Sequence, residues 1–590
     1  MTALHHQSVL LSYLRPEKKR AAMLVALLVC GIGMQLISPL IIRQFIDAAA
    51  RGGGGVSLNF LWLLAGGFIA AAIGTQLVQV GVAYYAEQIA WAATNLMRRD
   101  LAAHCLHLDM AFHTARTPGE LIERVDGDVV AISTIFSQFV TQVIGGGLLL
   151  IGILAVLYAQ DVRVGLALTV FAGVTILSLH LVRDLARDEF EAERQAWSEL
   201  SGFLEERIGG LDDIRANGGG SYVLKRLGVF ADALIARGVV AQRRGVLMYV
   251  MLGAIFTCGF AASLSLGVYL FQQGVITIGA VIMFAQYTTM MNDPLVRIGQ
   301  QLPQFQAAIA GLSRVGDLRA IQPLVKDGPG LGWQDAKTRA PDVAFEDVRF
   351  AYNDRETVID GVSFDVPAGA VLGLLGRTGS GKTTLTRLLF RLYDIRGGRI
   401  LLDGEPISRA TLNELRGRIG LVTQDVQMFE ASVRDNATLF DQSIPDARVA
   451  DVLTDLGLGP WLSRQKEGLD TILVGAGGLS AGEAQLLAFA RVFLKDPGLV
   501  VLDEATSRLD PTTDRLIERA MDKLLRAREG GAPRTAIIIA HKLETVRRAD
   551  KIVILDRGRV LEAGARAALA ADPGSRFAGL LRHGIEEVLT

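Results

Sequence analysis

Six long apolar stretches in the first half of the chain restrict its fold more than any other feature. They run over residues 21–44, 58–84, 136–158, 164–182, 246–271 and 276–291. A helix needs roughly 20 apolar residues to cross the hydrocarbon core of a bilayer, and most of these stretches reach that length. The sequence therefore predicts an all-α membrane domain of six helices within residues 1–320, embedded in a lipid bilayer.

Charged residues between the stretches predict the orientation of the membrane domain. Lys and Arg are retained in the cytoplasm, and they cluster in every second loop, at 15–20, 98–124 and 183–244. Both chain ends are therefore expected on the cytoplasmic side of the cytoplasmic membrane. The long cytoplasmic connections are expected to be helical, because residues 186–214 show helical apolar spacing.

Overall charge and cysteine content exclude other classes of site. Lys and Arg number 60 against 61 Asp and Glu, so no basic field indicates a nucleic-acid partner. Cys30, Cys105 and Cys258 lie far apart, and we expect small buried side chains rather than a disulfide framework or a metal site.

Nine polar residues lie in or near the expected spans: Gln35, Gln76, Gln79, Glu87, Gln142, His180, Gln286, Asn292 and Asp293. Ionisable groups inside a membrane are functional candidates by default. If the helices continue beyond the bilayer, however, Glu87, His180 and Asp293 lie in the headgroup region or the cytosol. We favour this interpretation, and no substrate site is assigned from these residues.

The composition changes after the last apolar stretch. Residues 321–340 are rich in Gly, Pro and Asp, which is typical of a linker. Beyond them, short apolar strands alternate with amphipathic helices. This pattern predicts an α/β domain over residues 341–590, of the size of one nucleotide-binding unit.

A phosphate-binding loop is the strongest chemical signal in this domain. The run Gly376-Arg-Thr-Gly-Ser-Gly-Lys382-Thr383 matches GxxxxGK[ST], follows an apolar strand and opens a helix, as the motif requires. Glycines let the backbone surround phosphate, Lys382 reaches the outer phosphates, and Thr383 can hold Mg²⁺. The residues expected to bind nucleotide are Gly376, Thr378, Gly379, Ser380, Gly381, Lys382, Thr383 and Thr384.

A second apolar strand, at 499–502, ends in Asp503 and Glu504. Asp503 is expected to bind Mg²⁺ through water, and Glu504 to polarise the water that attacks the γ-phosphate. Two acids after an apolar run more often mark a simple strand end. After a phosphate loop, they predict a site for ATP hydrolysis.

With further motifs in the right order, these residues resemble the ATP-binding cassette of ABC transporters over residues 343–564, and the whole chain is similar to an exporter-type half-transporter. The resemblance implies that Tyr352 stacks on adenine. It also implies that Gln424 contacts Mg²⁺ and the attacking water.

Later motifs continue the resemblance. Ser480 and Gly482 lie in the run Leu479-Ser-Ala-Gly-Glu483, which resembles the signature loop. Asp510 lies in the loop after the Mg²⁺ strand, and His541 resembles the switch histidine that contacts the γ-phosphate.

The resemblance also implies an architecture. The expected fold is a type I exporter membrane domain (type IV ABC fold) followed by an α/β P-loop NTPase. ATP and Mg²⁺ would be held between the phosphate loop of one cassette and the signature loop of another, so a second half-transporter is an expected partner. Segments 109–118 and 210–217 would be coupling helices that dock on the cassettes.

The signature loop departs from the usual LSGGQ, because Ala481 replaces a glycine and Glu483 replaces the glutamine. A methyl group and a carboxylate are thus added where the family binds phosphate. Glu504, Gln424 and His541 are intact. This combination favours a heterodimer, in which the partner supplies a standard signature loop; a homodimer is the competing arrangement.

The sequence as a whole predicts an ATPase that drives transport of a substrate by alternating access, and export is the favoured direction. Lipid, drug-like and peptide substrates stay open. Two alternatives are an importer with this architecture and a nucleotide-gated channel or ATP-sensing regulator. The complete hydrolytic set argues against the channel or sensor.

Overall fold

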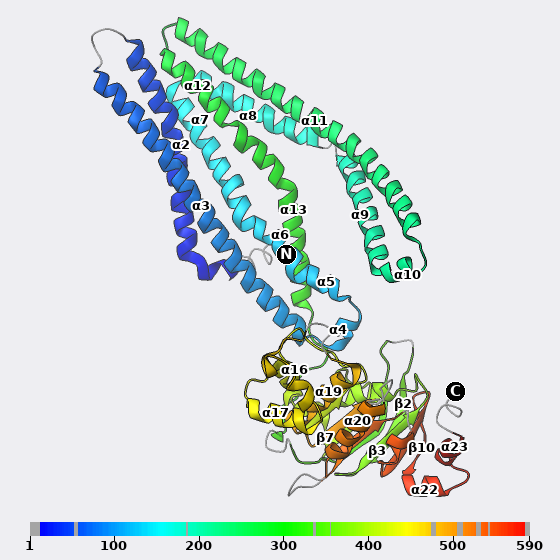
Figure 1. Ribbon diagram of the computed structural model, residues 1–590. Helices are drawn as coiled ribbons and strands as arrows, with labels where there is room; N and C mark the ends of the chain where they lie inside the picture. Colours follow the sequence, from blue (N-terminus) through cyan, green and yellow to red (C-terminus); the bar gives the residue numbers. More distant parts are fainter. Residues whose placement is uncertain are drawn as a thin grey trace. The chain divides into compact units, whose positions relative to one another are not determined.

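The chain forms two compact units. A computed structural model of the protein describes residues 12–51, 57–183, 187–333, 338–353, 356–473, 479–503, 511–526, 533–540 and 543–583. The helical unit comprises residues 1–106 and 118–321, coloured blue to green in Figure 1. The α/β unit comprises residues 322–590 and the short segment 107–117.

Long helices make up the helical unit. They are α2 (Lys18–Ala50), α3 (Leu58–His107), α5 (Pro118–Ile122), α6 (Asp128–Thr134), α7 (Gly145–Gln160), α8 (Val162–Arg183), α9 (Arg187–Gly209), α10 (Leu211–Ala216), α11 (Gly220–Gln272), α12 (Ile278–Met290) and α13 (Asn292–Ala320). Two π-helical segments, η2 (Glu123–Gly127) and η3 (Ile135–Ile144), connect α5, α6 and α7 into one continuous helical path.

Among the described residues, five helices are long and apolar enough to cross a membrane: Ser12–Ala50, Leu58–His107, Pro118–Gln160, Val162–Leu179 and Gly220–Gln272. Five of the six expected spans are thereby confirmed. The stretch expected as the sixth forms α12, which has only 13 residues and continues after Met291 into α13. Helix α12 packs against α2 and α11, and its Tyr287 donates a hydrogen bond of 2.6 Å to the carbonyl of Leu36.

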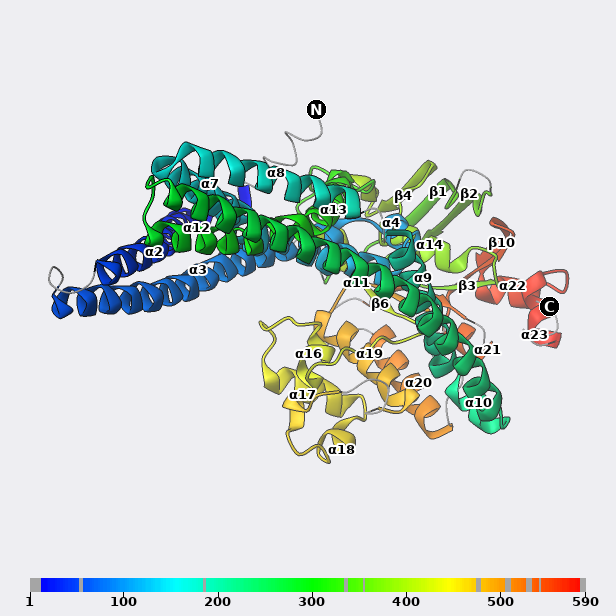
Figure 2. The same cartoon turned by 90° about the horizontal axis from the view of Figure 1, so that it is seen from above.

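The second long connection is a helical hairpin, as the apolar spacing predicts. Helix α9 and the first part of α11 run side by side and are joined by α10 (Figures 1 and 2). Between them, the rings of Phe203 and Phe230 lie 5.0 Å apart, and Arg244 forms an ion pair with Glu189.

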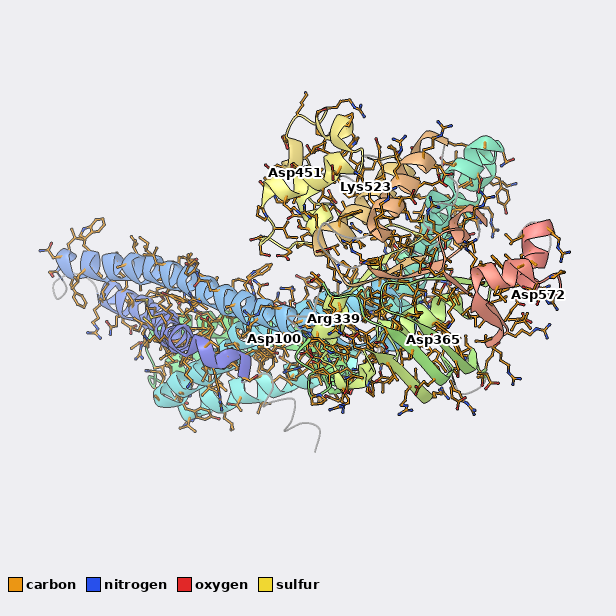
Figure 3. All side chains as sticks on the ribbon, turned by 90° about the horizontal axis from the view of Figure 1, so that it is seen from below. Asp100, Arg339, Asp365, Asp451, Lys523 and Asp572 are labelled. Carbon is orange, nitrogen blue, oxygen red and sulfur yellow. The ribbon has the colours of Figure 1, made fainter. Side chains whose placement is uncertain are left out.

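Two sheets form the centre of the α/β unit. The larger has the strand order β10-β9-β3-β8-β7-β6, and the smaller β2-β1-β4-β5. The strands are β1 (Val343–Phe350), β2 (Ile359–Val366), β3 (Val371–Gly376), β4 (Gly397–Leu402), β5 (Glu405–Pro406), β6 (Ile419–Val422), β7 (Leu499–Asp503), β8 (Thr535–Ile539), β9 (Lys551–Asp556) and β10 (Arg559–Ala565). Asp365, labelled in Figure 3, accepts a hydrogen bond of 2.7 Å from Lys551 and links β2 to β9.

Helices surround these sheets: α14 (Lys382–Leu389), α15 (Leu412–Arg418), α16 (Val433–Thr438), α17 (Asp446–Asp455), α18 (Gly459–Leu462), α19 (Ala481–Lys495), α20 (Pro511–Leu525), α21 (Leu543–Val546), α22 (Arg566–Ala571) and α23 (Arg576–His583). In the larger sheet, β9, β3, β8, β7 and β6 run parallel to one another, and β10 runs antiparallel to β9. Strand β3 is buried at all six positions, which explains its continuous apolar sequence.

The segment expected to be a linker is fastened along the α/β unit. The amide groups of Gly328 and Gly330 donate to the carbonyls of Ala410 and Arg409, at 3.1 and 3.0 Å. Trp333 is buried, with the Arg418 guanidinium 4.9 Å from its ring centre. We call residues 324–333 the strap, because they are held at both ends and in the middle.

The carboxylate of Glu414 binds the C-terminal end of the strap. It accepts hydrogen bonds from the amide groups of Leu331 and Gly332, at 3.2 and 2.9 Å. It also accepts one from the amide of Thr411, where it completes the N-terminal capping box of α15. These hydrogen bonds, with that from Thr411 contributing most, lower the pKa of Glu414 below its ordinary value.

Candidate nucleotide-binding site

The loop after β3 and Asp503 lie at one edge of the larger sheet. Leu374 of β3, Ile539 of β8 and Asp503 of β7 lie in register across three parallel strands. Neighbouring strands are about 4.8 Å apart, so the loop after β3 and the acid ending β7 are separated by one strand. Ligands bind beyond the carboxyl ends of strands in such sheets.

Glycine makes the phosphate loop possible. Gly379 has φ of +81° and Gly381 has φ of +105°, conformations that other residues rarely adopt. A side chain at Gly381 would also meet Ile359 at 2.5 Å. The backbone can therefore turn sharply into α14 only with glycine here.

Lys382 and Ser380 point to an anionic ligand. The Lys382 ammonium donates to the carbonyls of Gly376 and Arg377, at 2.7 and 3.0 Å, so it is held in the loop. The hydroxyl oxygen of Ser380 is buried and has no hydrogen-bond partner among the described residues. No side chain caps the N-terminus of α14. A phosphate would satisfy both the hydroxyl and the helix N-terminus.

The remaining residues of the loop differ in their exposure. Thr378 and Thr383 are exposed, and Thr383 lies in the first turn of α14. Thr384 is buried, and its hydroxyl lies 3.1 Å from that of Tyr352.

Tyr352, expected to stack on adenine, belongs to an aromatic cluster. Its ring packs edge-on against Phe350 at 4.9 Å and against Tyr393 at 5.1 Å. The residue as a whole is 41% exposed, so part of it is open to solvent. Tyr393 carries no motif, and sequence reasoning did not predict it.

Gln424 and Asp503 complete the described part of the site. Gln424 is exposed in the loop after β6, and Asp503 ends β7. The other three expected residues, Glu504, Asp510 and His541, lie outside the described residues. Within the described ranges, no group of three His, Cys, Asp or Glu side chains forms a metal site.

The altered signature loop forms a capping box at the start of α19. The Ser480 hydroxyl accepts from the amide of Glu483 at 3.2 Å, and the Glu483 carboxylate accepts from the amide of Ser480 at 2.8 Å. Gly482 lies so close to α20 that a side chain would meet Thr513 at 2.0 Å. The glutamate that replaces the usual glutamine thus has a local structural role.

Helix α19 also holds the loop that carries Gln424. The buried Gln485 donates to the carbonyl of Thr423 at 3.2 Å. Arg491 donates to the carbonyls of Gln427 and Asn436, at 3.0 and 2.8 Å, and its burial lowers its pKa. Helix α19 and the loop that carries Gln424 are therefore connected by several hydrogen bonds.

The first expected coupling helix is α4 (Met110–Thr114), within the α/β unit. Asp109 caps this helix by accepting from the amide of Phe112, and it also accepts from the amide of Leu324 in the strap at 2.6 Å. The Thr114 hydroxyl lies 3.1 Å from that of Tyr393. Helix α4 thus contacts the aromatic cluster that contains Tyr352. The second expected segment forms α10, in the helical unit.

Comparison with known proteins agrees with this architecture. Residues 21–295 match the ABC transporter transmembrane region, and residues 359–507 match the ABC transporter family. A Bacillus subtilis protein described as the uncharacterized ABC transporter ATP-binding protein YknV is 30% identical, over 97% of this chain and 93% of its own length.

Two further matches extend the comparison. The ATP-dependent lipid A-core flippase of Cupriavidus metallidurans is 29% identical, over 97% of this chain and 95% of its own length. The structure of a bacterial Atm1-family ABC exporter with ATP bound has the same fold, with a TM-score of 0.77 and 24% identity, over 96% of this chain and 98% of that one. These matches do not favour the channel, sensor or importer alternatives. The chain is a half-transporter of the ABC exporter family, an ATPase that drives export across a membrane with its transmembrane region and ATP-binding cassette fused in one polypeptide.

Proposed function

We propose that this half-transporter works in the cytoplasmic membrane, with its cassette in the cytoplasm, and pairs with a second half that carries a standard signature loop. The phosphate cradle around Lys382, with its unsatisfied Ser380 hydroxyl, carries the proposal that ATP is bound and hydrolysed on this chain. The two-domain boundary at residues 321–340 belongs to the same proposal.

Each nucleotide residue has a role in this proposal. The loop Gly376 to Thr384 binds the phosphates, and Tyr352 stacks on adenine. Glu504 polarises the attacking water, while His541 and Gln424 hold the γ-phosphate and the water in place. Asp510 supports the loop that follows Glu504.

Magnesium fits the donor set of the site. The Thr383 hydroxyl, the Gln424 amide and the Asp503 carboxylate all offer oxygen atoms, which Mg²⁺ prefers together with phosphate oxygens. They follow β3, β6 and β7 at one edge of the sheet. When bound, Mg²⁺ neutralises charge on the phosphates.

The signature loop carries the preference for a heterodimer. Ser480 and Gly482 would contact a γ-phosphate held by the partner. Glu483 places its carboxylate at the N-terminus of α19, where that phosphate would approach. Repulsion between the Glu483 carboxylate and the γ-phosphate would weaken ATP binding. The ATP site completed by this loop should therefore be the weaker of the two.

The test compares the chain alone with the chain co-purified with the half-transporter encoded by a neighbouring gene. We expect low ATPase activity alone and at least tenfold more in the pair, with loss on Lys382→Ala or Glu504→Gln. Full activity of the lone chain as a dimer would exclude the heterodimer and leave ATP-driven export intact. Normal activity in Lys382→Ala would contradict the assigned nucleotide site itself.

An amphiphilic substrate is the final part of the proposal. The Cupriavidus relative is described as a lipid A-core flippase, and a substrate that combines polar and apolar parts is the class that this likeness supports.

A further inference from the structure

The helical unit contains a cavity of about 1250 Å³ that collects the polar residues of the expected spans. Helices α2, α3, α7, α11, α12 and α13, which pack alongside one another in Figures 1 and 2, contribute its walls together with η3. Eight of the nine polar residues singled out from the sequence line it; the side chain of the ninth, His180, is not described. The structure therefore argues against treating them as incidental.

Amides dominate the polar wall. Six glutamines line the cavity: Gln35, Gln76, Gln79, Gln138, Gln142 and Gln286. A primary amide both donates and accepts hydrogen bonds, so this wall is suited to neutral polar groups that do the same. A purely apolar substrate that displaced water from these amides would leave them without hydrogen-bond partners, at a cost of about 1–3 kcal/mol for each.

Some polar side chains of the cavity wall already have hydrogen-bond partners within the protein, and others are available to a ligand. The hydroxyls of Thr75, Thr141 and Thr289 donate to carbonyls of their own helices. Gln142 accepts from Gln301 at 3.1 Å. By contrast, the side-chain oxygen of Gln286 is buried without a hydrogen-bond partner among the described residues. An unsatisfied acceptor at the cavity wall indicates a ligand that donates a hydrogen bond.

Charge excludes an anionic polar group. Among the lining residues, Glu87 and Asp293 are acidic and only Arg297 is basic. The cavity therefore carries a net negative charge and lacks the basic clusters that bind carboxylates or phosphates. Apolar side chains, including Phe68 and Phe260, line the rest.

We propose that the cavity binds an amphiphile whose polar part carries no negative charge and is rich in hydroxyl or amide groups, with Gln286 accepting a hydrogen bond from it. This inference rests on the proposed amphiphilic substrate and specifies its chemistry. Hydroxyl groups would indicate a glycolipid, and amide groups a lipidated or apolar peptide.

The experiment uses the assembled transporter in lipid nanodiscs and measures stimulation of its ATPase activity. Three probes share a twelve-carbon chain: dodecyl maltoside, dodecanoyl-glycylglycine amide and dodecyl phosphate. We expect the neutral probes to stimulate at concentrations at least tenfold lower than the phosphate. The stronger of the two neutral probes distinguishes the glycolipid from the peptide.

Variants then locate the effect. Gln286→Leu should raise the half-maximal concentration of the neutral probes at least fivefold, whereas Gln44→Leu, on an exposed position of α2 outside the cavity, should leave it unchanged. Equal or stronger stimulation by dodecyl phosphate, or no shift in Gln286→Leu, would overturn the inference. Basal ATPase activity lost in Lys382→Ala shows that the ATP-driven function holds in either case.

Discussion

Thr114 and Tyr393 lie 279 positions apart in the chain, yet their hydroxyl groups form a hydrogen bond of 3.1 Å. Tyr393 packs against Tyr352, whose hydroxyl in turn lies 3.1 Å from that of Thr384 at the start of α14. Contacts thus run without interruption from α4 to the start of α14.

Tyr393→Phe should weaken this connection while keeping the ring. A neutral hydrogen bond contributes about 1 kcal/mol, which corresponds to roughly a fivefold change in an equilibrium. We expect ATP affinity to stay near normal while the amount of substrate exported per ATP falls several-fold. Transport and ATPase assays on the same proteoliposomes measure this ratio. The exposed Tyr222→Phe is the control, and an unchanged ratio in Tyr393→Phe would show that the contact does not transmit coupling.

Ser380→Ala should have opposite effects on stability and on nucleotide binding. The buried Ser380 hydroxyl has no partner among the described residues, and removing an unsatisfied polar group stabilises a protein by about 1 kcal/mol. Without nucleotide, the melting temperature should therefore rise, whereas ATP affinity should fall. Thermal melts with and without ATP measure both. Ser463→Ala, which removes a satisfied hydrogen bond, should not raise the melting temperature; a fall in stability of Ser380→Ala would contradict this reading.

Acid should release the strap. The pKa of Glu414 is lowered by hydrogen bonds from Thr411, Leu331 and Gly332, so its ionised form stabilises the fold. That stabilisation is complete above the ordinary glutamate pKa of about 4.3 and is lost as the pH falls through the lower value of the folded protein. Hydrogen exchange at the strap, corrected for intrinsic rates, should therefore accelerate below about pH 4.

Glu414→Gln provides the control for the acid effect. It should exchange faster than the unaltered protein at pH 7, with little further change in acid, while Glu467→Gln on the exposed surface should behave like the unaltered protein. Strap exchange that ignores pH in the unaltered protein would remove Glu414 from this role.

Gln485→Ala should slow ATP hydrolysis without weakening ATP binding. Its side chain holds the carbonyl of Thr423, next to Gln424. Losing this contact leaves Gln424 less well positioned, so kcat should fall at least several-fold while KM for ATP changes little. A rise in KM with unchanged kcat would indicate a role in ATP binding instead.

The local motifs could be predicted because the residues that form each of them are close together in the sequence. A few neighbouring residues encode each of three features: the glycines of the phosphate loop, the buried β3 and the acid that ends β7. The long apolar helices are recognised by their length. The capping box of Ser480 and Glu483 is equally local. The Ser-x-x-Glu spacing is itself the pattern of a capping box, so this role could have been predicted from the sequence.

Long-range contacts could not be predicted in the same way. Nothing near Tyr393 indicates that Thr114 will approach it, and a Gly- and Pro-rich composition does not reveal that the strap will find Glu414. Cys30 and Cys258 were expected to be buried but are exposed, because the apolar faces of these helices point outward. The polar residues of the spans converge only because several helices each turn one side toward the same cavity.

The fastened strap has a mechanical consequence. A flexible linker would straighten under tension before it displaced the segments at its ends. Residues 324–333 are already held by hydrogen bonds from the amides of Gly328, Gly330 and Gly332. They cannot extend unless these hydrogen bonds break. A displacement of Leu324 is therefore passed to Asp109 through their hydrogen bond, and to α15 through the hydrogen bonds of the strap with Glu414.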